Sequence, residues 1–167
     1  PHEVYAACGA SVLYRKNILD KIGFFSKDIF MYYEDVDLCE RARMYGYTTM
    51  YQPASVIRHM HALSSQEWSP FFIYHAEKGR LVHMAHHFPM RIFLSQWYTF
   101  TIVAIGRMLS HAKVRSEWKK DIQYISVAFS ILRTLPSYLQ YRSQHGSAKK
   151  REDLYASLRN GTWLISQ

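Results

Sequence analysis

The chain is organised around residues 30–41, which read FMYYEDVDLCER. In this stretch three acids follow directly on four bulky apolar or aromatic residues; the acids are Glu34, Asp35 and Asp37. Apolar side chains then recur at every third position, while Glu40, Arg41 and Arg43 face elsewhere, and a glycine follows as a stop. The pattern predicts a helix over residues 34–45 that begins with acids behind an aromatic wall.

The first turn of this helix is a position where a carboxylate can be structural or catalytic. Unpaired backbone N–H groups and the helix dipole favour a charged carboxylate there, and a charged carboxylate beside an apolar wall suits a general base. Acids are also common in first turns, where they only cap the helix. From this stretch alone both interpretations of Glu34 and Asp35 stay open.

Length, charge and cysteine content narrow the class of protein. The chain has 167 residues, enough for one domain with a core, and it begins at Pro1 without a signal-peptide pattern, so we expect a segment of a longer protein. Its two cysteines, Cys8 and Cys39, give no disulfide framework, which favours buried thiols in a reducing compartment. The net charge of +8 lies within residues 107–151, which hold ten Lys/Arg and two Asp/Glu, whereas residues 1–106 carry +1. Such a basic block indicates an anionic surface partner.

Strand and helix patterns alternate in the first part of the chain, and helical patterns follow. We expect strands over residues 4–14, 47–51 and 55–58, helices over 15–22 and 34–45, and an aromatic loop over 24–33. This alternation predicts the end of an α/β domain. Beyond residue 64 we expect helices over 71–87, 90–109, 117–142 and 150–159.

Several motifs, in one order, connect these elements to a known family. They are Cys8-Gly9-Ala10-Ser11-Val12-Leu13-Tyr14-Arg15, Ile22-Gly23-Phe24-Phe25, the run from Phe30 to Leu38, Gly46-Tyr47, Pro53 and His59. Over roughly residues 5–90 they resemble the C-terminal half of the catalytic domain of a family-2 inverting glycosyltransferase, of the rhamnosyltransferase-like kind that builds bacterial surface polysaccharide. The resemblance implies inverting transfer of a hexosyl or rhamnosyl group from a nucleotide-sugar donor to a lipid-linked or polysaccharide acceptor.

The resemblance also implies a fold and a domain organisation. Residues 1–65 would be the acceptor side of a GT-A-type catalytic domain, an α/β fold with a Rossmann-like mixed sheet. The helical pattern and the basic block, rather than the resemblance, predict that residues 66–167 are an α-helical, membrane-associating extension. The nucleotide-binding half would lie outside this chain, so the chain alone is expected to be inactive.

The Glu-Asp pair carries the catalytic expectation. In the family that the chain resembles, the aspartate of this pair removes the proton of the acceptor hydroxyl, which makes Asp35 the expected general base. Glu34 would orient the acceptor or hold the turn, and Asp37 would be a helix-surface or acceptor-contacting acid. Asp35-Val36-Asp37 opens a helix instead of ending a strand, so we do not assign this D-x-D to a metal.

A histidine is the expected metal ligand. His59 resembles the family's ligand for a divalent cation on the donor diphosphate, Mn²⁺ or Mg²⁺. His61 is an alternative, because alternate residues point the same way on an extended strand, and a structural role is open for either histidine.

Small and aromatic residues complete the expected binding site. Cys8, Gly9 and Ala10 resemble the segment that lines the donor-sugar pocket, although tight strand packing also favours small residues. Tyr32 and Tyr33 would form a flat acceptor platform or, alternatively, belong to the core.

One cluster of histidines has the composition of a zinc site but lacks the other residues that zinc motifs contain. His83, His86 and His87 form an H-x-x-H-H pattern on the expected helix over residues 71–87. The pattern lacks both H-E-x-x-H and a cysteine partner, so we expect a solvated or membrane-facing stripe.

The C-terminal helices combine apolar faces with basic residues that include Arg142 and Arg151. We expect them to bind an anionic membrane surface, so that the protein is peripheral at the cytoplasmic face of the inner (plasma) membrane. Residues 92–109 would span the membrane or lie flat on it. Simple helix packing is the alternative to membrane binding, a homo-oligomer is compatible with the pattern, and nucleic acid is discounted because no recognition motif is present. The alternative function is a non-catalytic membrane-associating helical module.

Overall fold

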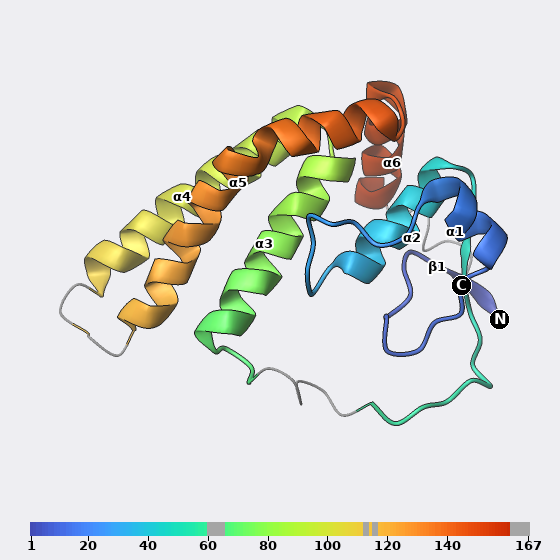
Figure 1. Ribbon diagram of the computed structural model, residues 1–167, viewed down its shortest axis with the longest axis horizontal. Helices are drawn as coiled ribbons and strands as arrows, with labels where there is room; N and C mark the ends of the chain where they lie inside the picture. The colour runs from blue at the N-terminus through green and yellow to red at the C-terminus, as the bar shows by residue number, and fades with distance from the viewer. Residues whose placement is uncertain (60–65, 112–113, 115–116, 161–167) are drawn as a thin grey trace.

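The computed structural model describes residues 1–59, 66–111, 114 and 117–160 (Figure 1). The elements, in order, are β1 (His2–Val4), α1 (Lys16–Ile22), α2 (Glu34–Met44), β2 (Thr49–Tyr51), α3 (Pro70–His87), α4 (Met90–Ser110), α5 (Trp118–Gln144) and α6 (Ala148–Asn160). The two strands pair antiparallel, with His2 opposite Tyr51 and Val4 opposite Thr49. The protein is mostly helical.

The expected α/β fold with a Rossmann-like mixed sheet is wrong. Within the described ranges the only strands are β1 and β2, of three residues each. Of the strand expected over residues 4–14 only Val4 belongs to a strand, because the backbone bends at Tyr5 and then turns at Cys8, whose carbonyl accepts a hydrogen bond from the Ser11 amide at 3.0 Å. Residues 55–58 also form no strand. A strand pattern becomes a sheet only where a neighbouring strand pairs with it, and this part of the chain supplies one such pair.

The expected helices are confirmed, with ends that differ by at most two residues. The start of α3 shows why the local sequence suffices. The Ser69 hydroxyl oxygen accepts a hydrogen bond from the Phe72 amide at 3.1 Å, and Pro70 occupies the first helical position, where its missing N–H costs nothing. The same helix ends at His87, two residues before Pro89, as a proline requires.

The hydrophobic core lies where α3, α4 and α5 pack together. In Figure 1, α4 and α5 run side by side as an antiparallel pair next to α3. Buried apolar residues from all three helices meet there: Leu81, Val82, Met84, Ala85, Phe93, Val127, Ile131 and Tyr138. The Trp97 indole N–H adds a hydrogen bond across the pair, to the Ala128 carbonyl at 3.1 Å.

Two arginines of α2 fasten this helix to the N-terminal segment. Arg43 donates to the carbonyls of Val4 and Tyr5, beside β1. Arg41 is buried and donates to the carbonyl of Ile22 at the end of α1, at 3.1 Å. The polar side of α2, expected to lie apart from the packed side, is therefore also in contact with the rest of the chain.

The C-terminal end of α3 is covered by two further arginines. Arg142 donates to the carbonyls of Ala85 and Phe88 at 2.7 and 2.8 Å, and the buried Arg151 donates to the carbonyl of His86 at 2.8 Å. The last carbonyls of a helix lack partners within the helix and carry partial negative charge, so a cation stabilises them. Arg142 and Arg151, expected among the membrane-facing basic residues, instead cap a helix.

Gly79, in the middle of α3, is where the loop before α2 touches that helix. A Cβ atom on Gly79 would fall far inside contact distance of the Tyr32 carbonyl oxygen. We expect Gly79→Ala to destabilise the protein by about 1–3 kcal/mol, because overpacking outweighs the gain in helix propensity. Gly106, inside α4, is the matched control, since its Cβ would meet nothing within 4 Å. Thermal unfolding should show Gly106→Ala unchanged or stabilised by up to about 1 kcal/mol; equal shifts for the two variants would contradict the prediction.

Candidate active site at the start of α2

Two tyrosines with left-handed backbone lead into α2. Tyr32 has φ of 64° and Tyr33, the residue before the helix, has φ of 69°. Positive φ is unfavourable for bulky residues and costs about 1–3 kcal/mol each, and such strain gathers at functional sites where the surroundings hold it. Here α3 holds it: the Tyr32 carbonyl packs on Gly79, and the Tyr32 ring lies 5.0 Å from the Phe72 ring. The start of α2 is therefore a strained position supported by α3.

Asp35 joins this helix start to the turn at residues 8–11. Its Oδ2 accepts a hydrogen bond from the Gly9 amide at 2.7 Å, and its Oδ1 accepts one from the Val36 amide at 2.8 Å. Each carboxylate oxygen has two lone pairs, so each retains a position that a hydroxyl group can occupy. Asp35 is partly exposed. The arrangement therefore suits both expected roles, a structural anchor for Gly9 and a base.

Glu34 and Tyr14 lie beside Asp35, and each has a buried polar atom without a hydrogen-bond partner in the described part of the chain. Glu34 Oε2 and the Tyr14 hydroxyl are buried and have no hydrogen-bond partner among the described residues. Burial raises the pKa of the Glu34 carboxyl, and the neighbouring charge of Asp35 raises it further. Burial likewise raises the pKa of Tyr14, with added contributions from Cys39, Asp35 and Glu34. Tyr14 was missed from the sequence, where only its place in the run after Cys8 singles it out.

The residues expected to line the donor pocket lie on the same turn. Cys8 and Ala10 are exposed, and Gly9 is the residue that contacts Asp35. Cys39 is buried and its sulfur accepts the Ala7 amide at 3.5 Å. Both thiols are free. The expectation that both are buried is wrong for Cys8, because the turn carries its side chain outward.

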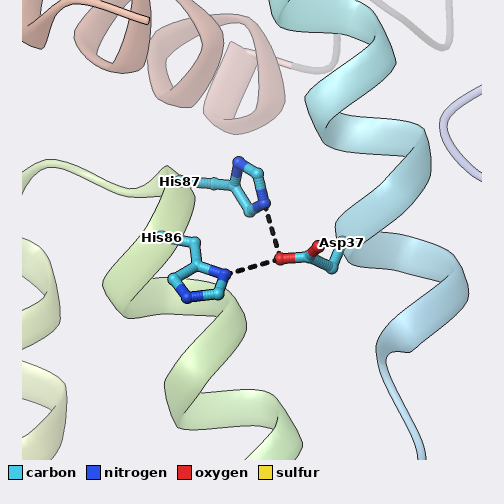
Figure 2. A group of neighbouring side chains, drawn as sticks. All are labelled: Asp37, His86 and His87. Atoms are coloured by element: carbon cyan, nitrogen blue, oxygen red, sulfur yellow. Dashed lines mark hydrogen bonds and ion pairs between the residues drawn. The ribbon is translucent and has the colours of Figure 1, made fainter. Parts of the chain in front are cut away.

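A buried polar cluster supports the site from behind. Figure 2 shows His86 and His87, at the end of α3, pointing at one carboxylate oxygen of Asp37 in α2. His86 Nδ1 lies 2.8 Å and His87 Nε2 2.9 Å from Asp37 Oδ1, while Arg41 donates to Oδ2 at 3.3 Å. Asp37 is 0% exposed, and both histidines are buried. The expected surface position of Asp37 is therefore wrong, since its carboxylate is held between two helices.

The histidine stripe is also not where the sequence placed it. His83, His86 and His87 are all buried, so the expected solvated or membrane-facing stripe is wrong. Each finds a carboxylate: His83 Nε2 lies 2.8 Å from Glu40, and His86 Nε2 lies 3.4 Å from Asp28, opposite its bond to Asp37. Charged partners on neighbouring elements make the burial of these polar rings tolerable.

The cluster shifts proton affinities in opposite directions. Burial acts to raise the pKa of Asp37, but the neighbouring His87 and His86 outweigh it and lower that pKa. Burial acts to lower the pKa of His86, yet hydrogen bonds to Asp28 and Asp37 raise it above its usual range. For His87 burial prevails and lowers the pKa, although the hydrogen-bonded carboxylate of Asp37 and the charge of Glu40 act to raise it.

The contributions of Asp37 and His86 to folding stability should depend on pH in opposite directions, and one variant of each residue tests this. Asp37 stabilises the fold above its unfolded pKa near 3.8, and this contribution is lost as the pH falls below that value. His86 stabilises the fold below its unfolded pKa near 6.5, and this contribution is lost as the pH rises through its higher folded pKa. In urea unfolding from pH 3 to 9, the deficit of Asp37→Asn should shrink toward acid and that of His86→Gln toward base. Parallel deficits would contradict this assignment.

Asp37, His86 and His87 also form the one group of metal-type ligands found among the described residues, with ligand atoms within 4.8 Å of one another. The direct hydrogen bonds and the Arg41 guanidinium already satisfy the Asp37 carboxylate. We therefore interpret the group as structural.

The expected metal ligand lies elsewhere. His59 is exposed, follows β2, and does not belong to that group of ligands. His61 lies outside the described residues. The expected acceptor platform is only partly available, because the Tyr32 ring packs on Phe72 and the Tyr33 ring lies 5.9 Å from the buried His83 ring.

Comparison with known proteins gives one distant relationship. No family model and no solved structure matches the chain. The chain is similar to the low-salt glycan biosynthesis hexosyltransferase Agl10 of Haloferax volcanii, with 26% identity over 123 residues. The aligned part covers 73% of this chain and 39% of the relative, so the chain spans about two fifths of that protein's length. The similarity indicates a distant glycosyltransferase-like relationship and does not extend to a family-2 or rhamnosyltransferase assignment.

Proposed function

We propose that this chain is the acceptor-side part of a glycosyltransferase in which Asp35 is the general base. The observation that carries the proposal is the Asp35 carboxylate, which is partly exposed at a strained helix start and oriented by the Gly9 amide. The distant similarity to a hexosyltransferase supports the class of reaction. We propose inverting transfer of a hexosyl or rhamnosyl group from a nucleotide sugar to a glycan or lipid-linked acceptor, as in family-2 enzymes.

The proposed chemistry is a single displacement. The acceptor oxygen loses its proton to Asp35 as it forms a bond to the anomeric carbon of the donor. The bond from that carbon to the diphosphate oxygen breaks in the same step, so the nucleoside diphosphate leaves and the configuration inverts. Glu34, beside Asp35 in the first turn, would orient the acceptor, and the turn of Cys8, Gly9 and Ala10 would face the donor sugar.

A divalent cation on the diphosphate is part of the same hypothesis, with His59 as its candidate ligand. A cation of this kind needs several ligands. The described part of the chain offers no group of three ligands that includes His59. Among the described residues His59 therefore has no set of fellow ligands for a cation, and no step above depends on one.

We also propose that α4 and α5 attach the enzyme to the cytoplasmic face of a membrane. Among the described residues, α4 is the one helix long and apolar enough to cross a membrane. It exposes an apolar stripe, Leu94, Tyr98, Ile102, Ile105 and Leu109, and α5 exposes another, Trp118, Ile122, Phe129, Leu132 and Leu139. We call these two stripes together the hairpin surface.

Lying flat suits this helix pair better than spanning. The indole of Trp97 bonds to α5, and Arg107 near the end of α4 pairs with Asp121 of α5 at 3.2 Å. Because α4 is packed on α5, a spanning α4 would carry the charges of Asp121 and Arg133 into hydrocarbon, which is unfavourable. Basic residues on α5, including Lys119 and Lys120, suit the headgroups of an anionic bilayer.

The enzymatic proposal is tested with the intact gene product. The protein is incubated with a panel of nucleotide sugars, Mn²⁺ or Mg²⁺ and a membrane extract, and labelled sugar in the product and release of nucleoside diphosphate are measured together. We expect both signals with at least one donor, and an inverted anomeric configuration by NMR. No transfer from any donor would favour the non-catalytic membrane module.

The hairpin surface gives a separate prediction. Phe129→Ser should weaken co-sedimentation with anionic phosphatidylglycerol vesicles by about tenfold, because a large apolar side chain no longer enters the interface. Leu13→Ser is the control, since Leu13 is 95% exposed but lies outside the hairpin surface. Equal binding by wild type and both variants would show that these helices do not contact the bilayer.

A further inference from the structure

A second group of exposed rings lies beside the start of α2, away from the hairpin surface. Six rings lie where the loop before α2 touches the first turns of α3, in two groups of three: Tyr32, Phe72 and Trp68 in one, and Phe30, His75 and Phe71 in the other. Phe72 lies between the rings of Tyr32 and Trp68, at centroid distances of 5.0 and 5.8 Å. His75 lies between the rings of Phe30 and Phe71, at 5.1 and 4.4 Å. We call this group the aromatic surface.

The outer rings of the aromatic surface are open to solvent. Phe30 is 73% exposed, Trp68 65% and Phe71 45%. The inner rings are the less exposed ones and support the outer ones from below. Exposed aromatic rings gathered in one place, rather than scattered singly, mark a binding surface.

Backbone strain falls on the same residues. Within the described ranges, three non-glycine residues have positive φ, and they are Tyr32, Tyr33 and Trp68, with Trp68 at 60°. All three are aromatic, and two of them belong to the aromatic surface. The ring of Trp68 is therefore presented by a backbone conformation that a random loop would avoid.

Charge separates this surface from the hairpin surface. Residues 24–37 hold one Lys/Arg and four Asp/Glu, and residues 66–75 hold one acid and no Lys/Arg. An anionic bilayer or a nucleic acid would meet no cationic cluster there. A neutral ligand with flat apolar faces and many hydroxyl groups suits rings that stand among carboxylates, because the rings stack and the carboxylates accept hydrogen bonds.

We propose that the aromatic surface is the acceptor subsite and that its ligand is a saccharide stacked on Phe30, Trp68 and Phe71. The inference rests on the proposed glycosyltransferase function, whose base, Asp35, lies two residues after Tyr33 in the chain. It replaces the platform expected from Tyr32 and Tyr33, whose rings pack on Phe72 and His83. The loop that carries Phe30 continues through Tyr32 and Tyr33 into Glu34 and Asp35, so the proposed subsite and the proposed base belong to one short segment of the chain.

The test is saccharide binding by the full-length protein, measured without any donor. A printed array of microbial surface glycans selects the best ligand, and calorimetry then gives its affinity for wild type, Phe30→Ala and Trp68→Ala. We expect each variant to bind about fivefold to tenfold more weakly. Phe129→Ala is the matched control, because Phe129 is also 73% exposed but belongs to the hairpin surface.

Each outcome of the binding experiment either supports or overturns the acceptor subsite. Loss of saccharide binding in Phe30→Ala and Trp68→Ala, with Phe129→Ala unchanged, supports the subsite. No array glycan bound by wild type, or equal affinity in all variants, overturns it. Loss of phosphatidylglycerol vesicle binding in Phe30→Ala instead assigns the surface to the membrane and also overturns it.

Transfer assays keep this inference apart from the proposed function. If sugar transfer occurs, Trp68→Ala should raise the KM for the acceptor about tenfold with little change in kcat, whereas a merely structural role would lower activity and stability together. If no donor supports transfer while the aromatic variants still lose saccharide binding, the proposed enzyme fails and the saccharide surface stands. If transfer occurs with unchanged KM in Trp68→Ala, the subsite fails and the enzyme stands.

Discussion

Replacing Asp35 by Asn is expected to lower the rate of sugar transfer by about 10²–10⁴-fold. The variant keeps one oxygen, which can accept the Gly9 amide hydrogen bond, so the turn at residues 8–11 should stay in place; the acceptor for the Val36 amide within the same helix start is lost. An amide oxygen does not take a proton at neutral pH, and the acceptor hydroxyl then has no base. The loss should appear in kcat, with the KM values for donor and acceptor nearly unchanged.

Two controls make the Asp35 experiment decisive. Circular dichroism of Asp35→Asn should match wild type, and its free energy of unfolding should fall by no more than about 1 kcal/mol, the contribution of the one lost hydrogen bond, to Val36, which separates lost chemistry from lost structure. Glu34→Gln should have a smaller effect, expressed mainly as a higher KM for the acceptor, because Glu34 is proposed to orient the acceptor. If Asp35→Asn retains activity within about threefold, the base is a different residue and Asp35 only anchors Gly9.

Replacing Asp37 by Ala is expected to cost about 3–5 kcal/mol of folding free energy, because it leaves buried charges without their partner. Asp37 is 0% exposed and accepts hydrogen bonds from His86, His87 and Arg41. A domain of this size is stable by only about 5–15 kcal/mol, so the variant should be close to unfolding. The free energy of unfolding in urea, at constant m-value, measures the loss.

Asp20→Ala is the matched control for Asp37. Asp20 forms an ion pair with Lys16 at 2.7 Å, one turn away on α1, but both side chains are largely exposed. Exposed pairs contribute little, so this variant should unfold near the wild-type urea midpoint. A similar small loss for Asp37→Ala would mean that the buried cluster does not hold α2 to α3.

Local sequence patterns predicted the helices well. The helix expected over residues 71–87 lies between two prolines, Pro70 and Pro89, and the structure has the helix within one residue. The prediction of a larger sheet was wrong because a sheet requires paired strands, and among the described residues only β1 and β2 pair. Hydrophobic period is a local property, whereas strand pairing depends on distant segments.

Part of the candidate site was likewise predictable from local sequence, and part was not. The acids at the start of α2 were visible in the sequence, and Asp35 lies at that start beside Gly9. The buried polar cluster was not visible, because Asp37, His86 and His87 are polar residues that a sequence pattern places at the surface. No local signal reveals that His86 lies against Asp37, 49 residues away.

The sequence by itself determined where the helices begin and end and which helix starts with acids, because these depend on residues within a few turns of one another. Only the tertiary structure decided that Asp37 is buried and Asp35 is not, although both lie in the first turn of α2. A carboxylate is buried only where groups from elsewhere in the chain satisfy it. His86 and His87 do so for Asp37, and for Asp35 the Gly9 amide leaves room for a further partner.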